Sequence, residues 1–239
     1  MPDEVYFNAL TAMFAVMGAI AGGTGTEFIN RYWRGRKERD EKKRELLKRY
    51  LYGFQESAES LWYRLYNLSY RGGKDVMDND YLLTSTLYSI GSVLAYHRIM
   101  RLEGVYADLN FLGTDYMKFR QSVERFGKCL DNVGYSINSN LFRYDRISLA
   151  EALLSRDEGQ NMYRIITYLE FKEKWFSEEG QKRKTLATAL NFVKALTERE
   201  NIESQLNEIM ENLHTTAVTL AKETRIDTTI GKNENYTVK

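Results

Sequence analysis

The chain contains 239 residues, of which 43% are hydrophobic and 28% are charged, and its formal net charge is +1. This composition predicts a globular body with a buried core, and the nearly balanced charge excludes a surface that is basic throughout. The only proline is Pro2 and the only cysteine is Cys129, so we expect uninterrupted helices, no internal disulfide and no cysteine-based metal site. The sequence therefore predicts an all-α protein.

An uncharged stretch, Val5 to Thr26, lies near the start of the chain. A helix of about 20 mainly apolar residues can cross a bilayer, so residues 1–27 are predicted to form a single transmembrane anchor. Asp3 and Glu4 precede the stretch and a basic run follows it. By the positive-inside rule, this places the N-terminus outside and the remaining chain in the cytoplasm. There are two alternatives for this stretch. One is a signal peptide that is cleaved at residues 19–21, and the other is a buried helix of a soluble protein.

Small residues recur along the predicted anchor at spacings of three and four, which would place them on one helical face. Such a face lets a second membrane helix approach closely and favours a homo-oligomer. The alternative explanation is that Gly and Ala are simply frequent in membrane helices. The predicted packing face consists of Ala15, Gly18 and Gly22.

Residues 28–50 are predicted to form a basic helical stalk next to the membrane. Ten basic and four acidic residues lie between Arg31 and Arg49, and pairs such as Glu38 with Lys42 have the spacing of neighbours on a helix. Basic residues near a bilayer also attract anionic headgroups, at about 1 kcal/mol each. The predicted membrane interface consists of Arg31, Tyr32, Trp33, Arg34, Arg36 and Lys37.

Residues 51–224 are predicted to form a helical bundle of about seven or eight helices, and residues 225–239 a disordered tail. The segment from Tyr81 to His97 has no charged residue. Its many hydroxyl side chains favour a central helix of the bundle over residues 81–100, with a second membrane span as the alternative. The other helices that apolar periodicity predicts most clearly are Gln55–Tyr70, residues 116–130 and Gln181–Thr224, the last with a kink or break near Thr197.

Between these helices, the sequence from Ser148 to Glu151 matches a capping box and predicts the start of a short helix. Gly159 precedes a segment that we expect to form a longer helix. The apolar residues of that helix would be Met162, Ile166, Leu169 and Phe176.

Few residues in the sequence are candidates for catalysis or metal binding. His214 with Glu211 matches half of a di-iron motif, but the second half is missing, and we expect no metal, cofactor or catalytic residue. His97 follows Tyr96 at the end of the uncharged run and could belong to a ligand site with the loop Asn132–Asn140. The ordinary alternative is a core histidine near the end of a helix.

The sequence therefore predicts a single-pass, membrane-anchored helical protein that acts through protein–protein contacts, as an adaptor or scaffold with an unidentified protein partner. A helical enzyme or small-ligand binder with a site near Tyr96 and His97 is the alternative. Nucleic-acid binding through residues 31–49 is less favoured, because acidic residues are interleaved with the basic ones.

Overall fold

The computed structural model describes residues 18, 31, 33–70, 79–109, 115–131, 140–157, 159, 162–175, 177–181, 184–198, 203–228 and 230. They divide into two compact units, with the boundary between Leu46 and Leu47. The predicted anchor lies outside the described residues except for Gly18, as does Tyr32 of the predicted interface. Within the described part of the chain, no helix is both long enough and apolar enough to cross a membrane.

The first unit contains a helix over residues 33–46, most of whose side chains are exposed. Lys37 and Glu41 form an ion pair of 3.8 Å one turn apart, and the Arg36 guanidinium lies 5.8 Å from the centre of the Trp33 ring. Local pairs of this kind each stabilise an exposed helix by about 0.2–0.5 kcal/mol. The charged segment is thus helical where it is described.

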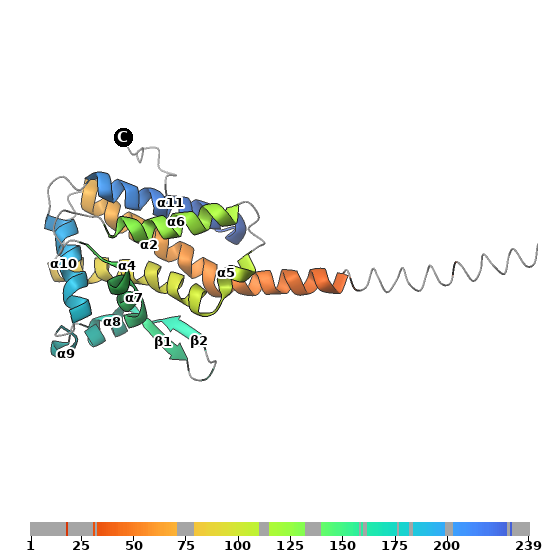
Figure 1. The fold of residues 1–239 in the computed structure, drawn as a ribbon, viewed down its shortest axis with the longest axis horizontal. Helices are drawn as coiled ribbons and strands as arrows, with labels where there is room; N and C mark the ends of the chain where they lie inside the picture. Colours follow the sequence, from red (N-terminus) through yellow and green to blue (C-terminus); the bar gives the residue numbers. More distant parts are fainter. Residues whose placement is uncertain are drawn as a thin grey trace, which may run out of the picture. The chain divides into compact units, whose positions relative to one another are not determined.

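The second unit is a mostly helical body, which confirms the prediction of an all-α fold. Its long helices lie side by side, and shorter helices pack against α4 (Figure 1). The long helices are α2 (Tyr52–Tyr70), α4 (Asn79–Leu102), α6 (Asp115–Cys129) and α11 (Glu203–Thr224), and the shorter ones are α7 (Arg143–Ala152) and α10 (Lys184–Glu198). The remaining helical elements are the π-helix η1 (Leu47–Leu51), α5 (Val105–Asp108), α8 (Tyr168–Trp175) and α9 (Glu178–Gln181).

The core of the body lies where α2 and α11 meet α4 and α6. Phe54, Leu61 and Phe119 are fully buried there, and burial of each such side chain contributes roughly 1.5–3 kcal/mol. Polar groups in this core are paired, as in the 2.8 Å hydrogen bond between the hydroxyls of Ser122 and Thr216. The four helices are therefore fixed by apolar burial together with a few specific hydrogen bonds.

Helix α4 is the central helix of the body. It is covered by α2 on one side and by α7 and α10 on the other, which explains why its sequence lacks charge over so many residues. Gly91 allows a close approach of Leu153, because a Cβ atom at this position would lie 2.9 Å from the Leu153 side chain. The chain leaves α4 through Gly104, whose φ of 68° lies in the left-handed region that glycine favours.

A β-hairpin replaces part of the predicted helix after Gly159. β1 (Leu154–Asp157) and β2 (Met162–Ile165) pair antiparallel, with Leu154 opposite Ile165. The backbone N–H of Gly159 donates to the Asp157 carboxylate over 3.0 Å, a turn contact that competes with helix formation. The prediction of a helix carrying Met162 was therefore wrong.

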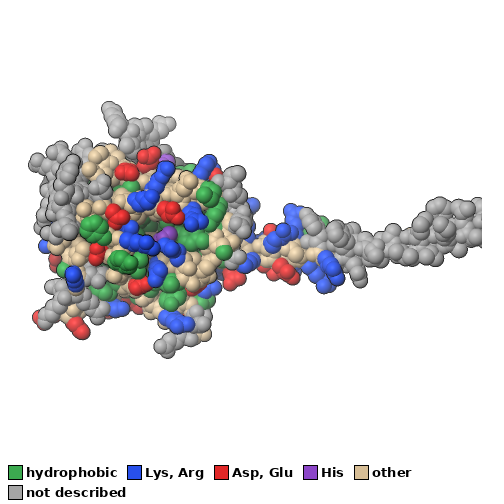
Figure 2. Space-filling model, viewed as in Figure 1, with side chains coloured by type: hydrophobic (Ala, Val, Ile, Leu, Met, Phe, Trp, Pro, Cys, Tyr) green, Lys and Arg blue, Asp and Glu red, His purple; other side chains and the backbone are tan. Residues whose placement is uncertain are grey.

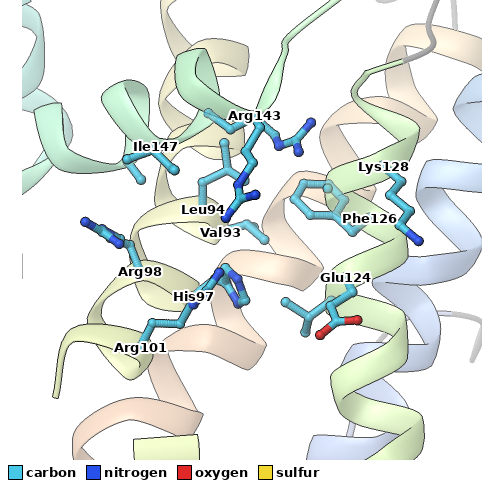
Figure 3. Close-up of a pocket in the computed structure, with 14 residues that line it drawn as sticks. Val93, Leu94, His97, Arg98, Arg101, Glu124, Phe126, Lys128, Arg143 and Ile147 are labelled. Carbon is cyan, nitrogen blue, oxygen red and sulfur yellow. The ribbon is translucent and has the colours of Figure 1, made fainter. Parts of the chain in front are cut away.

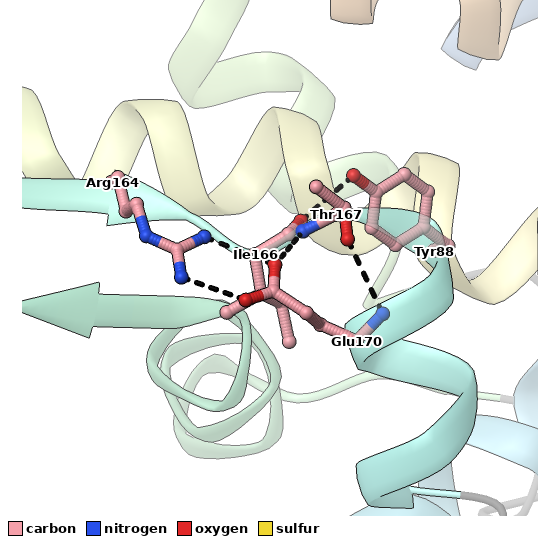
Figure 4. Close-up of polar contacts among 5 residues, drawn as sticks. All are labelled: Tyr88, Arg164, Ile166, Thr167 and Glu170. Carbon is pink, nitrogen blue, oxygen red and sulfur yellow. Dashed lines mark hydrogen bonds and ion pairs between the residues drawn. The ribbon is translucent and has the colours of Figure 1, made fainter.

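The ends of the neighbouring helices also differ from the prediction. Helix α7 begins at Arg143, so Ser148 lies inside this helix instead of capping it. The capping box belongs to α8, where the Thr167 hydroxyl accepts from the Glu170 N–H and the Glu170 carboxylate accepts from the Thr167 N–H (Figure 4). Thr167 and Glu170 thus fix the start of α8 directly after the hairpin.

The hairpin is held to its surroundings by the same residues. Arg164 donates twice to the Glu170 carboxylate, over 2.7 and 3.0 Å, and the Tyr88 hydroxyl of α4 donates to the carbonyl of Ile166 over 2.9 Å (Figure 4). The Arg164 guanidinium, followed by the Thr167 N–H, lowers the pKa of Glu170 to about 2. β2, α8 and α4 therefore form one connected unit.

The long C-terminal helical region is broken, as predicted for the neighbourhood of Thr197. α10 ends at Glu198 and α11 begins at Glu203. At its other end, α11 is tied to α2 by the Thr224 hydroxyl, which donates to the buried Gln55 side chain over 2.6 Å.

Candidate functional site

A cavity of about 350 Å³ lies where α4, α6 and α7 meet (Figure 3). Its apolar lining comes from all three helices and includes Val93, Phe126 and Ile147. The size is within the range of small-ligand sites, roughly 300–1,000 Å³. His97 is one of the residues that line this cavity.

Basic side chains dominate the polar lining of this cavity. They are Arg98 and Arg101 from α4, Lys128 from α6, and Arg143 and Arg146 from α7, whereas Glu124 is the single carboxylate among the lining residues. Figure 2 shows Lys and Arg side chains gathered around a hollow on this face of the body. On α4 and α7 the arginines are three residues apart, a spacing that places both on the same side of a helix.

Two of the five cations are already neutralised by neighbours. Arg98 pairs with Glu151 over 2.6 Å, and Arg146 pairs with Asp131 and donates to the carbonyl of Leu141 over 2.9 Å. These arginines connect α4 to α7 and α7 to the end of α6. The charges of Arg98 and Arg146 therefore help to hold together the helices that form the cavity.

The other three cations are not neutralised. The side chains of Arg101, Lys128 and Arg143 make no hydrogen bond or ion pair with any residue that the structure describes. All three side chains are exposed to solvent. Several like charges around one concavity still produce a positive potential that attracts anions. The cavity thus has an excess of positive charge together with free N–H donors.

His97 adds a neutral donor to this wall. Its Nδ1 atom lies 2.5 Å from the Tyr106 hydroxyl. Burial, with Arg101 as the next cause and Arg146 and Arg98 acting in the same direction, lowers the pKa of His97 to about 4, although Glu124 opposes the shift. The imidazole is therefore uncharged at neutral pH.

The tautomer of His97 follows from its partner. Burial raises the pKa of the Tyr106 phenol, so the hydroxyl keeps its proton. This hydroxyl has no other hydrogen-bond acceptor among the described residues, so we assign it as the donor to Nδ1. The ring proton of neutral His97 is then on Nε2, which leaves an N–H for a ligand.

A second cavity of about 310 Å³ adjoins the first, and His97, Arg101 and Glu124 line both. Its further lining includes Tyr106 and Arg120. The region around His97 is therefore concave and polar along more than one turn of α4.

The structure does not bring Tyr96 into the same site as His97. The Tyr96 ring stacks on Phe54 at 6.2 Å and lines a different cleft of about 300 Å³, together with Gly53 and Ser57 of α2. Successive residues of an α-helix point about 100° apart, which separates these two neighbours. Of the predicted loop, residues 132–139 lie outside the described residues.

The residues that accompany His97 were missed by the sequence analysis. Arg101, Lys128 and Arg143 lie on three helices that are distant in the sequence. The arginine pairs at a spacing of three were a detectable signal on α4 and α7, but nothing in the sequence indicates that these two pairs share a cavity.

The other residues considered for chemistry lie elsewhere. His214 is exposed on α11, and no group of three or more potential ligands that could hold a metal ion occurs among the described residues. Cys129 is buried, and burial raises the pKa of its thiol to about 12. Of the predicted interface, Arg31, Trp33, Arg34, Arg36 and Lys37 are described and lie in the charged first unit, whereas Ala15 and Gly22 are outside the described residues.

No protein-family model, no curated protein and no solved structure matches this chain.

Proposed function

We propose that the helical body binds a small anionic ligand in the cavity around His97. The observation that carries this proposal is the presence of Arg101, Lys128 and Arg143 around one cavity of about 350 Å³, without a carboxylate partner among the described residues. Like charges held close together destabilise a fold, and a bound anion would offset their repulsion. The Nε2–H of His97 and the guanidinium groups supply donors for the oxygens of a phosphate, sulfate or carboxylate.

The residue types that line the cavity fit ligand binding better than they fit catalysis. None of the residues that line this cavity is Ser, Thr or Cys, the side chains that most often serve as nucleophiles. The neutral His97 is held through Nδ1 by a phenol and not by a carboxylate, so it lacks the partner that usually makes histidine a strong base. A sensing or carrier role is therefore the form of ligand binding that we propose.

Titration calorimetry of the full-length chain with inorganic phosphate tests the proposal. We expect saturable binding that weakens as salt increases, and an affinity at least tenfold lower in Arg143→Gln, because a charge-assisted hydrogen bond contributes roughly 1.5–3 kcal/mol. Lys172→Gln, at an exposed position of α8, is the matched control and should bind like the wild type. Equal phosphate affinity in both variants, or no binding at millimolar phosphate, would contradict the proposal.

We also propose that the N-terminal segment tethers this body to a membrane, with the N-terminus outside. A protein partner would then distinguish the body with bound ligand from the body without it. The support is the uncharged stretch Val5–Thr26, followed by a helix over residues 33–46 whose exposed side chains are mostly charged. Membrane fractionation tests the tether: the full chain should sediment with membranes and need detergent for release. Recovery of the full chain in the soluble fraction would refute it.

The less favoured nucleic-acid function predicts a different result. Binding to DNA through residues 31–49 should fall steeply with salt concentration and should disappear when residues 1–50 are removed. Retention on a DNA column that does not change with this deletion would rule out the basic segment as a nucleic-acid arm.

A further inference from the structure

The cavity around His97 offers different chemistry at Arg143 and at Glu124. Figure 3 shows Arg143 on one side of the space and Glu124 on the opposite side, with His97 and Phe126 on the walls between them. A ligand that spans the space from Arg143 to Glu124 meets a guanidinium on one side and a carboxylate on the other, with an apolar wall and a neutral donor between them. Arg98 and Arg101 lie beside His97 on the α4 wall.

Glu124 determines what its side of the cavity can accept. Its Oε1 atom accepts from the Arg120 Nε over 3.1 Å, whereas its Oε2 atom accepts no hydrogen bond from a described residue. An ionised carboxylate has acceptors only, so it repels a second anionic group and attracts an O–H or N–H donor. A simple anion without a donor, such as sulfate, would make no hydrogen bond to this carboxylate.

The size of the cavity also favours a ligand larger than an inorganic anion. Liquid water occupies about 30 Å³ per molecule, so the volume of about 350 Å³ holds roughly a dozen groups of that size. A phosphate ion alone would leave most of the space to water. The apolar side chains of Val93, Phe126 and Ile147 would then contact the carbon atoms of an organic ligand.

From this arrangement we infer that the ligand is an organic phosphate that carries hydroxyl groups, with its phosphate near Arg143 and Lys128 and a hydroxyl donating to Glu124. The inference rests on the proposed binding of anions and adds the chemical class of the ligand. Glycerol phosphate is the simplest compound of this class. The same group occurs free in solution and in the headgroup of phosphatidylglycerol, so the shared chemistry is a phosphorylated polyol.

A matched pair of ligands isolates the contribution of Glu124. Glycerol phosphate and propyl phosphate have similar size and charge, but propyl phosphate lacks hydroxyl groups. In calorimetry with the full-length chain, glycerol phosphate should bind about tenfold more tightly, the effect of one hydrogen bond to a charged acceptor. Glu124→Leu should abolish this preference while propyl phosphate still binds, and Glu173→Leu, at an exposed position of α8, should leave the preference unchanged.

The outcomes separate the two proposals. If neither phosphate binds, anion binding itself is refuted. If both bind equally to the wild type, or if the preference survives in Glu124→Leu, anion binding stands and the inferred ligand class is wrong.

A third ligand, short-chain phosphatidylglycerol, identifies the source of the phosphorylated polyol. Tighter binding than that of glycerol phosphate supports a lipid headgroup, and weaker binding supports a soluble metabolite. In either case the binding of the preferred compound must weaken in Glu124→Leu, and an unchanged affinity would overturn the role of Glu124.

Discussion

Acidification should destabilise this protein through one histidine, and the effect can be isolated because the chain contains only His97 and His214. His97 lines the cavity, is partly buried and contacts Tyr106, whereas His214 is exposed on α11. The perturbation is a pH change from 7 to 5, applied to the wild type and to the variants His97→Asn and His214→Asn.

The magnitude follows from the difference in His97 pKa between the two states. Histidine in an unfolded chain has a pKa near 6.5, and burial together with nearby arginines lowers the pKa of folded His97 to about 4. The unfolded state therefore binds the proton first, so the stability from neutral His97 is complete above pH 6.5 and is lost as pH falls towards 4. One pKa unit corresponds to about 1.36 kcal/mol, which gives a loss of about 2 kcal/mol at pH 5 and about 3 kcal/mol below pH 4.

Urea unfolding at pH 7, 6 and 5 measures this loss. The free energy of unfolding of the wild type and of His214→Asn should fall by about 2 kcal/mol over this range, whereas His97→Asn should remain nearly constant, whatever its absolute stability. Glu170, whose pKa is lowered to about 2 by Arg164, loses its contribution only below its unfolded pKa near 4.3, outside this window. Parallel pH profiles for the wild type and His97→Asn would refute the assignment of His97 as a buried neutral group.

Three further predictions concern the core and the buried thiol. Phe119→Ala should reduce the free energy of unfolding by about 3–5 kcal/mol in urea, since Phe119 is fully buried against Phe54 and Tyr106; the exposed Met117→Ala on the same helix should have little effect, and equal losses would contradict the packing. Gly180→Ala should cost roughly 1–3 kcal/mol, because the new Cβ would lie 2.5 Å from the Trp175 carbonyl oxygen; a melting temperature like that of the exposed Gly159→Ala would disprove this crowding. Cys129 should react with a thiol reagent at pH 8 only after unfolding, because burial raises its pKa to about 12, and rapid labelling of the native protein would show that the thiol is accessible.

The long helices could be predicted from the sequence because each carries an apolar stripe that repeats over several turns. The uncharged run of α4 also indicated its central position, since a helix covered on several sides has no face for charged residues. The hairpin could not be found in this way. Strands of four residues are too short for periodicity to distinguish them from helix. Gly159 suggests a boundary before a longer helix, but in the structure it lies in the turn that follows Asp157.

A local signal for the true helix start was nevertheless present. Thr167 and Glu170 have the spacing of a capping box, as Ser148 and Glu151 do, and only the structure shows that the first pair caps α8 while the second lies within α7. Two equivalent motifs cannot be ranked by sequence when tertiary packing decides which helix extends further.

The candidate site could be predicted only in part, for a similar reason. His97 was identified because it ends an uncharged run, but its surroundings depend on which helices α4 meets. Arg101 and Arg143 are separated by more than forty residues in the sequence and come together through the packing of α7 on α4. The pattern of charges along one helix indicates which of its faces is charged. It does not indicate which other helix packs against that face.

The cations of the cavity have two separate tasks, and this separation supports a binding role. Arg98 and Arg146 are paired with Glu151 and Asp131 and thereby hold α4, α6 and α7 at fixed positions, while Arg101, Lys128 and Arg143 make no such contacts among the described residues. The paired arginines account for contacts between the helices, and the side chains of the other three cations remain available to a ligand. Because one set of arginines joins the three helices, the helices that carry the other set are positioned before a ligand arrives, which lowers the entropic cost of binding.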